Sequence, residues 1–415
     1  MKYVMIRCED DTWPHEDLRG LLDGAKAPHL LQLSHAGAGG RLELDTDGPW
    51  VDRLALHCAL LGLDPRAAES APAAWYAAAA DLQLAPDERA WCCELVTQRD
   101  GTFIDPSAGG ITTKESQVLI QALDEQLGSD TRRWEVGDGP HHILVMKQTA
   151  IPAGPEPQIA APAVMTGQRW KRRLPRGAIG RTLAALVEQA GRILEQHPVN
   201  RVRIDLGENP ANLIWLWGGS ASSGPPAGGR LRRHGASGAS DPNPSVQGFR
   251  ARTGHSGAVI APRFPFRGLG RACGLTWQEL PEGSTEPAYE LLFRTIMQIL
   301  DGHDLIYAVL SITHTDPIER LCAMERLDHA VLRPLTERLG AQEPWRLLVV
   351  PDNRMPGWVP FVAIGSGLPQ QPVMGLTASA FEASPLSFRN GRALLDWFLQ
   401  PSPAAQAAAG RPGSG

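Results

Sequence analysis

Short unbroken runs of apolar residues alternate along this chain with longer stretches in which apolar residues recur every three or four positions. The unbroken runs indicate buried strands, and the wider spacing indicates amphipathic helices. Because the two kinds of segment alternate in the second half, we expect an α/β fold whose mostly parallel sheet has helices on both faces. The predicted strands cover Met1 to Arg7, 41–44, 209–219, Leu305 to Ile312 and Trp345 to Val350, and the predicted helices cover 18–33, 179–196, 292–300 and 318–339.

The region around residue 100 has a different order of elements. Residues 91–128 follow the order strand, turn, strand, loop and helix, and Thr112 or Thr113 is placed to cap that helix. Another strand is predicted at 141–146, followed by a proline-rich linker at 151–162. This order is typical of a small α+β unit.

The chain therefore divides into a core and an inserted unit, because it leaves the α/β pattern early and returns to it later. We predict a discontinuous core, 1–70 with 166–400; an inserted α+β domain, 71–165; a mobile loop rich in glycine, serine and proline, 220–244; and a disordered tail, 401–415.

An acidic cluster follows the first predicted strand. Glu9 and Asp10 come directly after the apolar run that begins the chain. In an open α/β sheet, ligands bind beyond the carboxyl ends of parallel strands, and carboxylates at that place can hold a metal. A solvated acidic turn is the alternative. Glu9 and Asp10 are the first candidate site residues.

Composition narrows the functional classes. The formal net charge of −5 gives no reason to expect nucleic acid or an anionic membrane as partner. No apolar run approaches the length of a membrane span, and the amino terminus lacks a signal-peptide pattern, so we expect a cytoplasmic protein. The six cysteines include no CxxC pair, which favours reduced thiols over a disulfide framework or a zinc site.

A basic run with one tryptophan covers residues 168–173, Gln-Arg-Trp-Lys-Arg-Arg. Arg169 is a candidate for binding an anionic ligand. A solvated basic loop is the alternative interpretation, because runs of like charge commonly lie on the surface.

Five stretches of the sequence, spread through nearly the whole chain, carry a resemblance to a known family. They are MKYV at the start, DRLALHCALLGLDP at 52–65, ELVTQRDGTFIDPSAGGITTKE at 94–115, NPANLIWLWG at 209–218, and GAVI with RGLGR within 257–271. Together, and in this order, they resemble the archaeal-type cofactor-independent phosphoglycerate mutases of the alkaline phosphatase superfamily. The resemblance implies an alkaline-phosphatase-like core with an inserted domain.

The resemblance also implies a serine nucleophile followed by Asp, and two divalent ions held by Asp and His residues at strand ends. The family's first metal-binding Asp falls on Glu9, which can still ligate. Its Ser-Asp pair falls on Val51-Asp52. Valine has no group that can attack phosphorus, so the nucleophile is absent from this position.

The later metal motifs also depart from the family. After Leu305 to Ile312 the chain has His314 and Asp316 but is several residues short, and Asp352-Asn353 stands where the family has Asp-His. The family's final His has no counterpart. Among the substrate positions, Cys92-Cys93 replaces an Arg-Cys pair and Gly110 replaces a His.

These departures predict a protein that keeps the phosphomutase fold but is a non-catalytic binding or scaffolding protein with no cofactor. The alternative is an enzyme with one Mn or Mg ion that acts on a small phosphorylated metabolite. The expected partner is a small phosphorylated ligand or a protein. The residues concerned are Glu9, Asp10, Asp316 and Asp352 as metal ligands; Asp52, His314, Arg169 and Asn353 as ligand-binding residues, with His314 also the base of the alternative enzyme; and Trp50, Trp91 and Trp358 as contacts.

Overall fold

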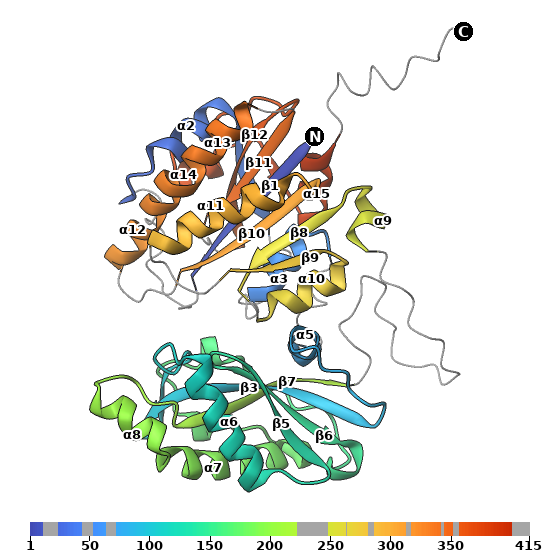
Figure 1. Cartoon of the computed structure of the whole chain (residues 1–415), viewed down its shortest axis with the longest axis vertical. Helices are drawn as coiled ribbons and strands as arrows, with labels where there is room; N and C mark the ends of the chain where they lie inside the picture. Colours follow the sequence, from blue (N-terminus) through green and yellow to red (C-terminus); the bar gives the residue numbers. More distant parts are fainter. Residues whose placement is uncertain are drawn as a thin grey trace.

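The computed structural model has two lobes (Figure 1). The upper lobe in that view holds the beginning and the second half of the described chain, and the lower lobe holds the part between them. The residues that the structure describes are 1–10, 24–43, 53–63, 72–221, 248–262, 264–280, 286–312, 317–341, 344–351 and 357–400.

The first lobe is built on one sheet, in which the described residues form eight strands in the order β13-β2-β12-β11-β1-β10-β8-β9. The pairs from β11 through β1, β10 and β8 to β9 are parallel, whereas β12 is antiparallel to both of its neighbours. The mostly parallel sheet is therefore confirmed. The strands are β1 (Lys2–Asp10), β2 (Ala38–Glu43), β8 (Gly257–Ala261), β9 (Thr276–Glu279), β10 (Leu305–Ile312), β11 (Trp345–Val350), β12 (Trp358–Gly365) and β13 (Ser387–Phe388).

Helices cover both faces of this sheet. In β1, Val4 and Ile6 belong to one core cluster, and the alternate residues Tyr3 and Met5 belong to the other, as the period of a strand requires. The first cluster packs under α2 (Pro28–Ala36), α11 (Glu286–Leu300), α12 (Pro317–Leu327), a π-helical turn (Asp328–Leu332), α13 (Arg333–Gly340) and α14 (Ala378–Glu382); the second packs under α3 (Arg53–Leu60), α9 (Phe249–Thr253), α10 (Phe266–Cys273) and α15 (Gly391–Leu399).

The second lobe is an antiparallel sheet with helices packed on it. Its central strand β3 pairs with β4, β6 and β7, and β5 pairs with β6. The capping box at Thr112 and Glu115, predicted in part from sequence, is present at the start of α6. The elements are β3 (Glu88–Arg99), β4 (Thr102–Asp105), β5 (Arg132–Asp138), β6 (His141–Lys147), β7 (Leu213–Ala221), α5 (Pro72–Ala79), α6 (Thr113–Leu127), α7 (Gly177–Glu195), α8 (Pro198–Asp205) and 3-10 turns at Gln148–Ala150, Pro162–Val164 and Trp170–Arg173.

The predicted end of the inserted unit at residue 165 differs from the structure. Strand β7 lies beside β3 in the second sheet, and α7 packs against β7 in the same core. The proline-rich segment is not a free linker, because the carbonyl oxygen of Ala160 accepts a hydrogen bond from the indole of Trp215 at 2.8 Å. The second lobe therefore continues to Ala221.

The two lobes meet through α5, which packs against α10 of the first lobe. Gly268 permits this approach, since a Cβ there would lie 2.2 Å from the carbonyl oxygen of Trp75. The carboxylate of Asp81, just beyond α5, forms ion pairs with Arg267 and Arg271 of α10. Tight packing and paired charges thus fix the junction.

Two expectations fall on other parts of the chain. The predicted loop, 220–244, begins two residues too early, because Ser220 and Ala221 belong to β7. Its other residues and the predicted tail, 401–415, lie outside the described residues and remain predictions. Within the described ranges, no helix combines the length and the apolar character needed to cross a membrane.

Candidate functional site

The carboxyl ends of three neighbouring parallel strands form one edge of the first sheet. Strand β1 lies between β10 and β11, with Asp10 opposite Ile312 and Arg7 opposite Val350. Figure 1 shows β1 running from the amino terminus toward the second lobe. This edge is the place where an open α/β sheet binds ligands.

The structure places the backbone of Glu9 and Asp10 at this edge, as predicted, at the end of β1. The other candidate metal ligands follow neighbouring strands in sequence: Asp316 comes four residues after β10, and Asp352 comes two residues after β11. The positions Trp50, Val51, Asp52, His314, Asp316, Asp352 and Asn353 lie outside the described residues.

A buried arginine, which sequence reasoning missed, lies just before these acids. Arg7 is fully buried in β1, and its Nη1 donates hydrogen bonds to the carbonyl oxygens of Val350, at 3.3 Å, and Pro351, at 2.8 Å. Pro351 directly precedes Asp352. The guanidinium of Arg7 is therefore held next to the residue that precedes the predicted metal ligand Asp352. The sequence feature that could have revealed it is a charged residue within the apolar run of the first strand.

The helix that follows Val51 and Asp52 is anchored to the sheet by a polar contact. In α3, His57 Nδ1 lies 2.5 Å from the hydroxyl oxygen of Tyr307 on β10, and both residues are fully buried. The His57 ring also meets the ring of Phe266 edge on, at 4.7 Å between centroids. These contacts hold α3, the helix that follows the family's nucleophile position in the sequence, against the sheet.

A second polar cluster lies in the second lobe where α5 packs on β3 and β6. The carboxylate of Glu94 accepts a hydrogen bond from the hydroxyl of Tyr76 at 2.6 Å and lies 2.6 Å from Nδ1 of His141. Glu94 is 3% exposed, whereas the side chain of His141 is 20% exposed. The arrangement can orient an imidazole and exchange a proton with it. Sequence reasoning missed it, although a Glu within an apolar strand was a signal.

Cys92, Cys93 and Gly110, which replace substrate-binding residues of the family, all lie in the second lobe, but only the two cysteines are buried. Cys92 and Cys93 are both fully buried, and burial raises the pKa of the Cys93 thiol far above its ordinary value. Gly110 has a φ of +65°, and a Cβ there would meet nothing within 4 Å. The two cysteines are therefore core residues, and the space beside Gly110 is open.

The remaining candidates do not gather at the strand ends. Arg169 pairs by a β-bridge with Thr102 in the second lobe, and its side chain is exposed. Trp91, expected to contact a ligand, is instead a fully buried core residue whose indole donates to Glu156 at 3.1 Å. Trp358 is half-buried on β12. Within the described ranges, no three His, Cys, Asp or Glu side chains form a group that could hold a metal.

The sequence is similar to those of known phosphoglycerate mutases. The family model described as 2,3-bisphosphoglycerate-independent phosphoglycerate mutase matches residues 55–200. Proteins with that name from Methanosarcina barkeri and Methanosarcina mazei are 30% and 29% identical to this chain, over 86% of this chain and 86% of each relative. A probable 2,3-bisphosphoglycerate-independent phosphoglycerate mutase from Geobacter sulfurreducens is 27% identical with the same coverage.

Solved structures agree in fold. The cofactor-independent phosphoglycerate mutase of Thermoplasma acidophilum is similar with a TM-score of 0.53 and 20% identity, over 96% of this chain and 99% of that one. A protein of Pyrococcus horikoshii is similar with a TM-score of 0.64 and 16% identity, over 100% of this chain and 99% of that one. These two likenesses concern the fold. The relative that is 30% identical over 86% of both chains shows that the chain belongs to the 2,3-bisphosphoglycerate-independent phosphoglycerate mutase family.

Proposed function

We propose that this member of the family is a binding or scaffolding protein that does not interconvert phosphoglycerates. The observation that carries the proposal is Val51, which stands where the family resemblance places the serine nucleophile. An isopropyl side chain offers no lone pair to phosphorus, and no neighbouring base can activate it. The Asp52 carboxylate that follows remains available for binding.

A small phosphorylated ligand is the occupant that we propose for this edge of the sheet. Its candidate contacts are Asp52, His314 and Asn353, together with Arg169 of the second lobe. Arg and Asn side chains suit a phosphate group, because they donate hydrogen bonds to its oxygens.

The neighbouring strand ends favour a second candidate function. Glu9 and Asp10 end β1, and Asp316 and Asp352 come soon after the neighbouring parallel strands β10 and β11 in the sequence. A set of carboxylate oxygens suits Mg or Mn. Such an ion would polarise a phosphate of a small metabolite, with His314 as base. The relatives named as phosphoglycerate mutases make phosphoryl transfer the natural reaction of this alternative.

Assays on the full chain separate the two proposals. We expect no conversion of 3-phosphoglycerate to 2-phosphoglycerate with added Mn or Mg, and no tight Mn binding by calorimetry. Manganese-dependent turnover that is lost in Glu9→Ala would overturn the non-catalytic proposal. A tight Mn site lost in Glu9→Ala, together with hydrolysis of a chromogenic phosphate ester, would establish the alternative enzyme.

Restoring residues gives a sharper test. Val51→Ser alone should leave phosphomutase and phosphatase activity at background, because the hydroxyl would still lack the ions that activate it. Val51→Ser with Asn353→His should be compared in the same assay. Activity in the single variant would mean that the metal site is intact and that only the nucleophile had changed.

A further inference from the structure

Helix α7 lies on the side of the second lobe that is farther from the first lobe (Figure 1). A groove runs along this helix. It consists of two hollows of about 500 Å³ each, which share Gln189. Residues of α7 line both hollows at steps of three and four from Ala178 onward, so they lie on one face of the helix. The groove follows this face for roughly 28 Å, from Ala178 to His197.

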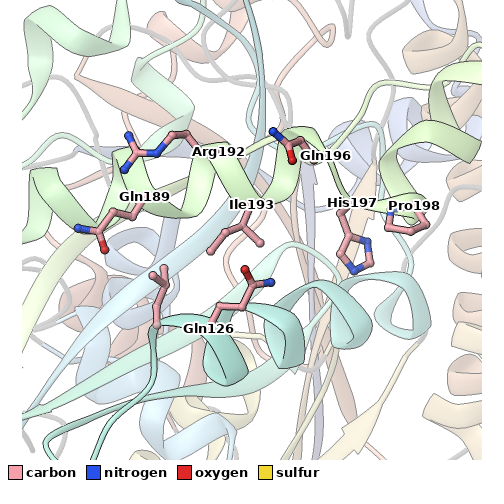
Figure 2. Close-up of a pocket in the computed structure, with 8 residues that line it drawn as sticks. Gln126, Gln189, Arg192, Ile193, Gln196, His197 and Pro198 are labelled. Carbon is pink, nitrogen blue, oxygen red and sulfur yellow. The ribbon is translucent and has the colours of Figure 1, made fainter.

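The lower wall of one hollow comes from the end of α6. Figure 2 shows Gln126 of α6 opposite Ile193, with Gln196 and His197 at the end of α7. In the other hollow, Arg132 and Pro152 face α7. The groove is therefore bounded by separate elements of a folded lobe, whose positions are fixed by the core beneath them.

Apolar side chains form the floor of the groove. Leu186 is 2% exposed, Leu127 and Ile193 are half-buried, and Ala185 adds a small exposed methyl group. A floor of this kind favours an occupant that brings apolar side chains of its own.

The walls of the groove are cationic. Arg132, Arg181 and Arg192 line it, and no carboxylate is among the described residues that do so. Arg181 and Arg192 are exposed and take part in no ion pair within the described chain. The sequence supports this local excess of positive charge, because no acidic residue occurs between Glu156 and Glu188.

From the apolar floor and the arginine walls, we propose that the α7 groove binds an acidic amphipathic helix of a partner protein. Apolar residues of the partner at helical spacing would cover Leu127, Ala185 and Ile193. Its Glu or Asp side chains would pair with Arg181 and Arg192. The complementary charges speed the association of the two proteins, and burial of the apolar floor adds to the affinity.

Nucleic acid fits the groove less well. Single strands bind by stacking bases on exposed aromatic rings, and no Phe, Tyr or Trp is among the described residues that line the groove. Trp170, the aromatic residue of the nearby basic run, is only 6% exposed because it belongs to the core of the lobe.

Fluorescence anisotropy with the full chain tests the proposal. The probe is a labelled peptide of about 18 residues with Leu at helical spacing and Glu at the remaining positions, long enough to span the groove. We expect saturable binding, which weakens about tenfold when Gln replaces every Glu or when the protein carries Arg181→Glu with Arg192→Glu. The matched control, Lys114→Glu with Arg172→Glu, changes the net charge equally at two exposed residues outside the groove.

A steric variant distinguishes the groove from general charge attraction. Ala185→Trp fills the groove without changing the charge, and we expect it to weaken binding about as much as the double reversal. Three results would overturn the proposal: equal binding by the double reversal and its control, tighter binding of a labelled oligonucleotide than of the Glu peptide, or a concentration-dependent dimer that the double reversal dissociates. The last result would assign the groove to a second copy of this chain.

Discussion

The guanidinium of Arg7 donates a hydrogen bond to the carbonyl oxygen of Pro351 at 2.8 Å and thereby joins the ends of two neighbouring parallel strands. The same guanidinium bonds to Val350, so it meets two successive carbonyls at the end of β11. Backbone groups at the end of a sheet need partners when they are buried. A side chain of the adjacent strand provides them here.

We therefore expect Arg7→Met to destabilise the protein by about 2–3 kcal/mol, because it leaves buried carbonyl groups without their charged donor. Urea unfolding measures this change. Arg172→Met, at an exposed arginine, is the control and should remain within about 0.5 kcal/mol of the original chain. An equal effect of both substitutions would contradict the structural role of Arg7.

His142 should make stability depend on pH. Burial, with a smaller contribution from the charge of His141, lowers the pKa of His142 from 6.5 to about 3. The unfolded chain therefore binds a proton below about pH 6.5 that the folded chain does not bind until about pH 3. The stability contributed by the neutral imidazole is complete above pH 6.5 and falls by up to about 1.4 kcal/mol per pH unit below it.

The measurement is urea unfolding of the protein and of His142→Leu at several values between pH 7.5 and pH 4. The variant should be less stable at pH 7.5 but should lose stability less steeply on acidification. His35→Gln, at an exposed histidine, should keep the original slope. Parallel pH profiles for the protein and for His142→Leu would show that this histidine is not the one that titrates on unfolding.

Arg203 should be a second buried arginine on which stability depends. It is 3% exposed; it donates to the carbonyl oxygens of Asn209 and Ala108, at 3.0 Å each, and pairs with Glu115 at 2.8 Å. Arg203→Met should cost about 2–4 kcal/mol, because three segments lose a common donor. Arg201→Met, two residues earlier on the exposed side of α8, should change stability little.

The junction between the lobes gives a fourth prediction. Gly268→Ala should destabilise the chain by about 1–3 kcal/mol, because the new methyl group would meet the carbonyl oxygen of Trp75 at 2.2 Å and force α5 and α10 apart. Thermal unfolding should show the loss. Gly340→Ala, where a Cβ meets nothing within 4 Å, should be neutral or stabilising. If Gly268→Ala is as stable as the original chain, α5 and α10 can move apart without cost and the prediction is wrong.

Local patterns predicted the central strands β1, β10 and β11 of the first sheet well. Both β10 and β11 have the bounds that their apolar runs indicate, since a strand buried on both faces contains few polar residues. The antiparallel strands β5 and β12 were missed, because β5 carries charged residues and β12 contains Pro360. The boundary at residue 165 was wrong because the pairing of β7 with β3 joins distant segments, and local spacing carries no information about such pairing.

At the candidate site, the sequence predicted that acidic residues lie at the end of the first strand, but it did not predict the buried arginine beside them. Glu9 and Asp10 follow an apolar run, so their place at the end of a strand could be inferred. Arg7 was counted as the end of that run, because charged residues usually mark the end of a buried strand. Its carbonyl partners belong to β11, more than 300 residues later, and only the fold brings them together.

The position of β1 in the sheet has a consequence for the order of folding. The first strand of the chain pairs only with segments made late in synthesis: Tyr3 lies opposite Leu305 on one side and Arg346 on the other. The elements between α5 and β7, in contrast, contact one another within residues 72–221. Contacts between distant residues cost more chain entropy and form slowly. During synthesis on the ribosome, we expect the second lobe to fold first. Strand β1 can pair only after β10 and β11 have been synthesised.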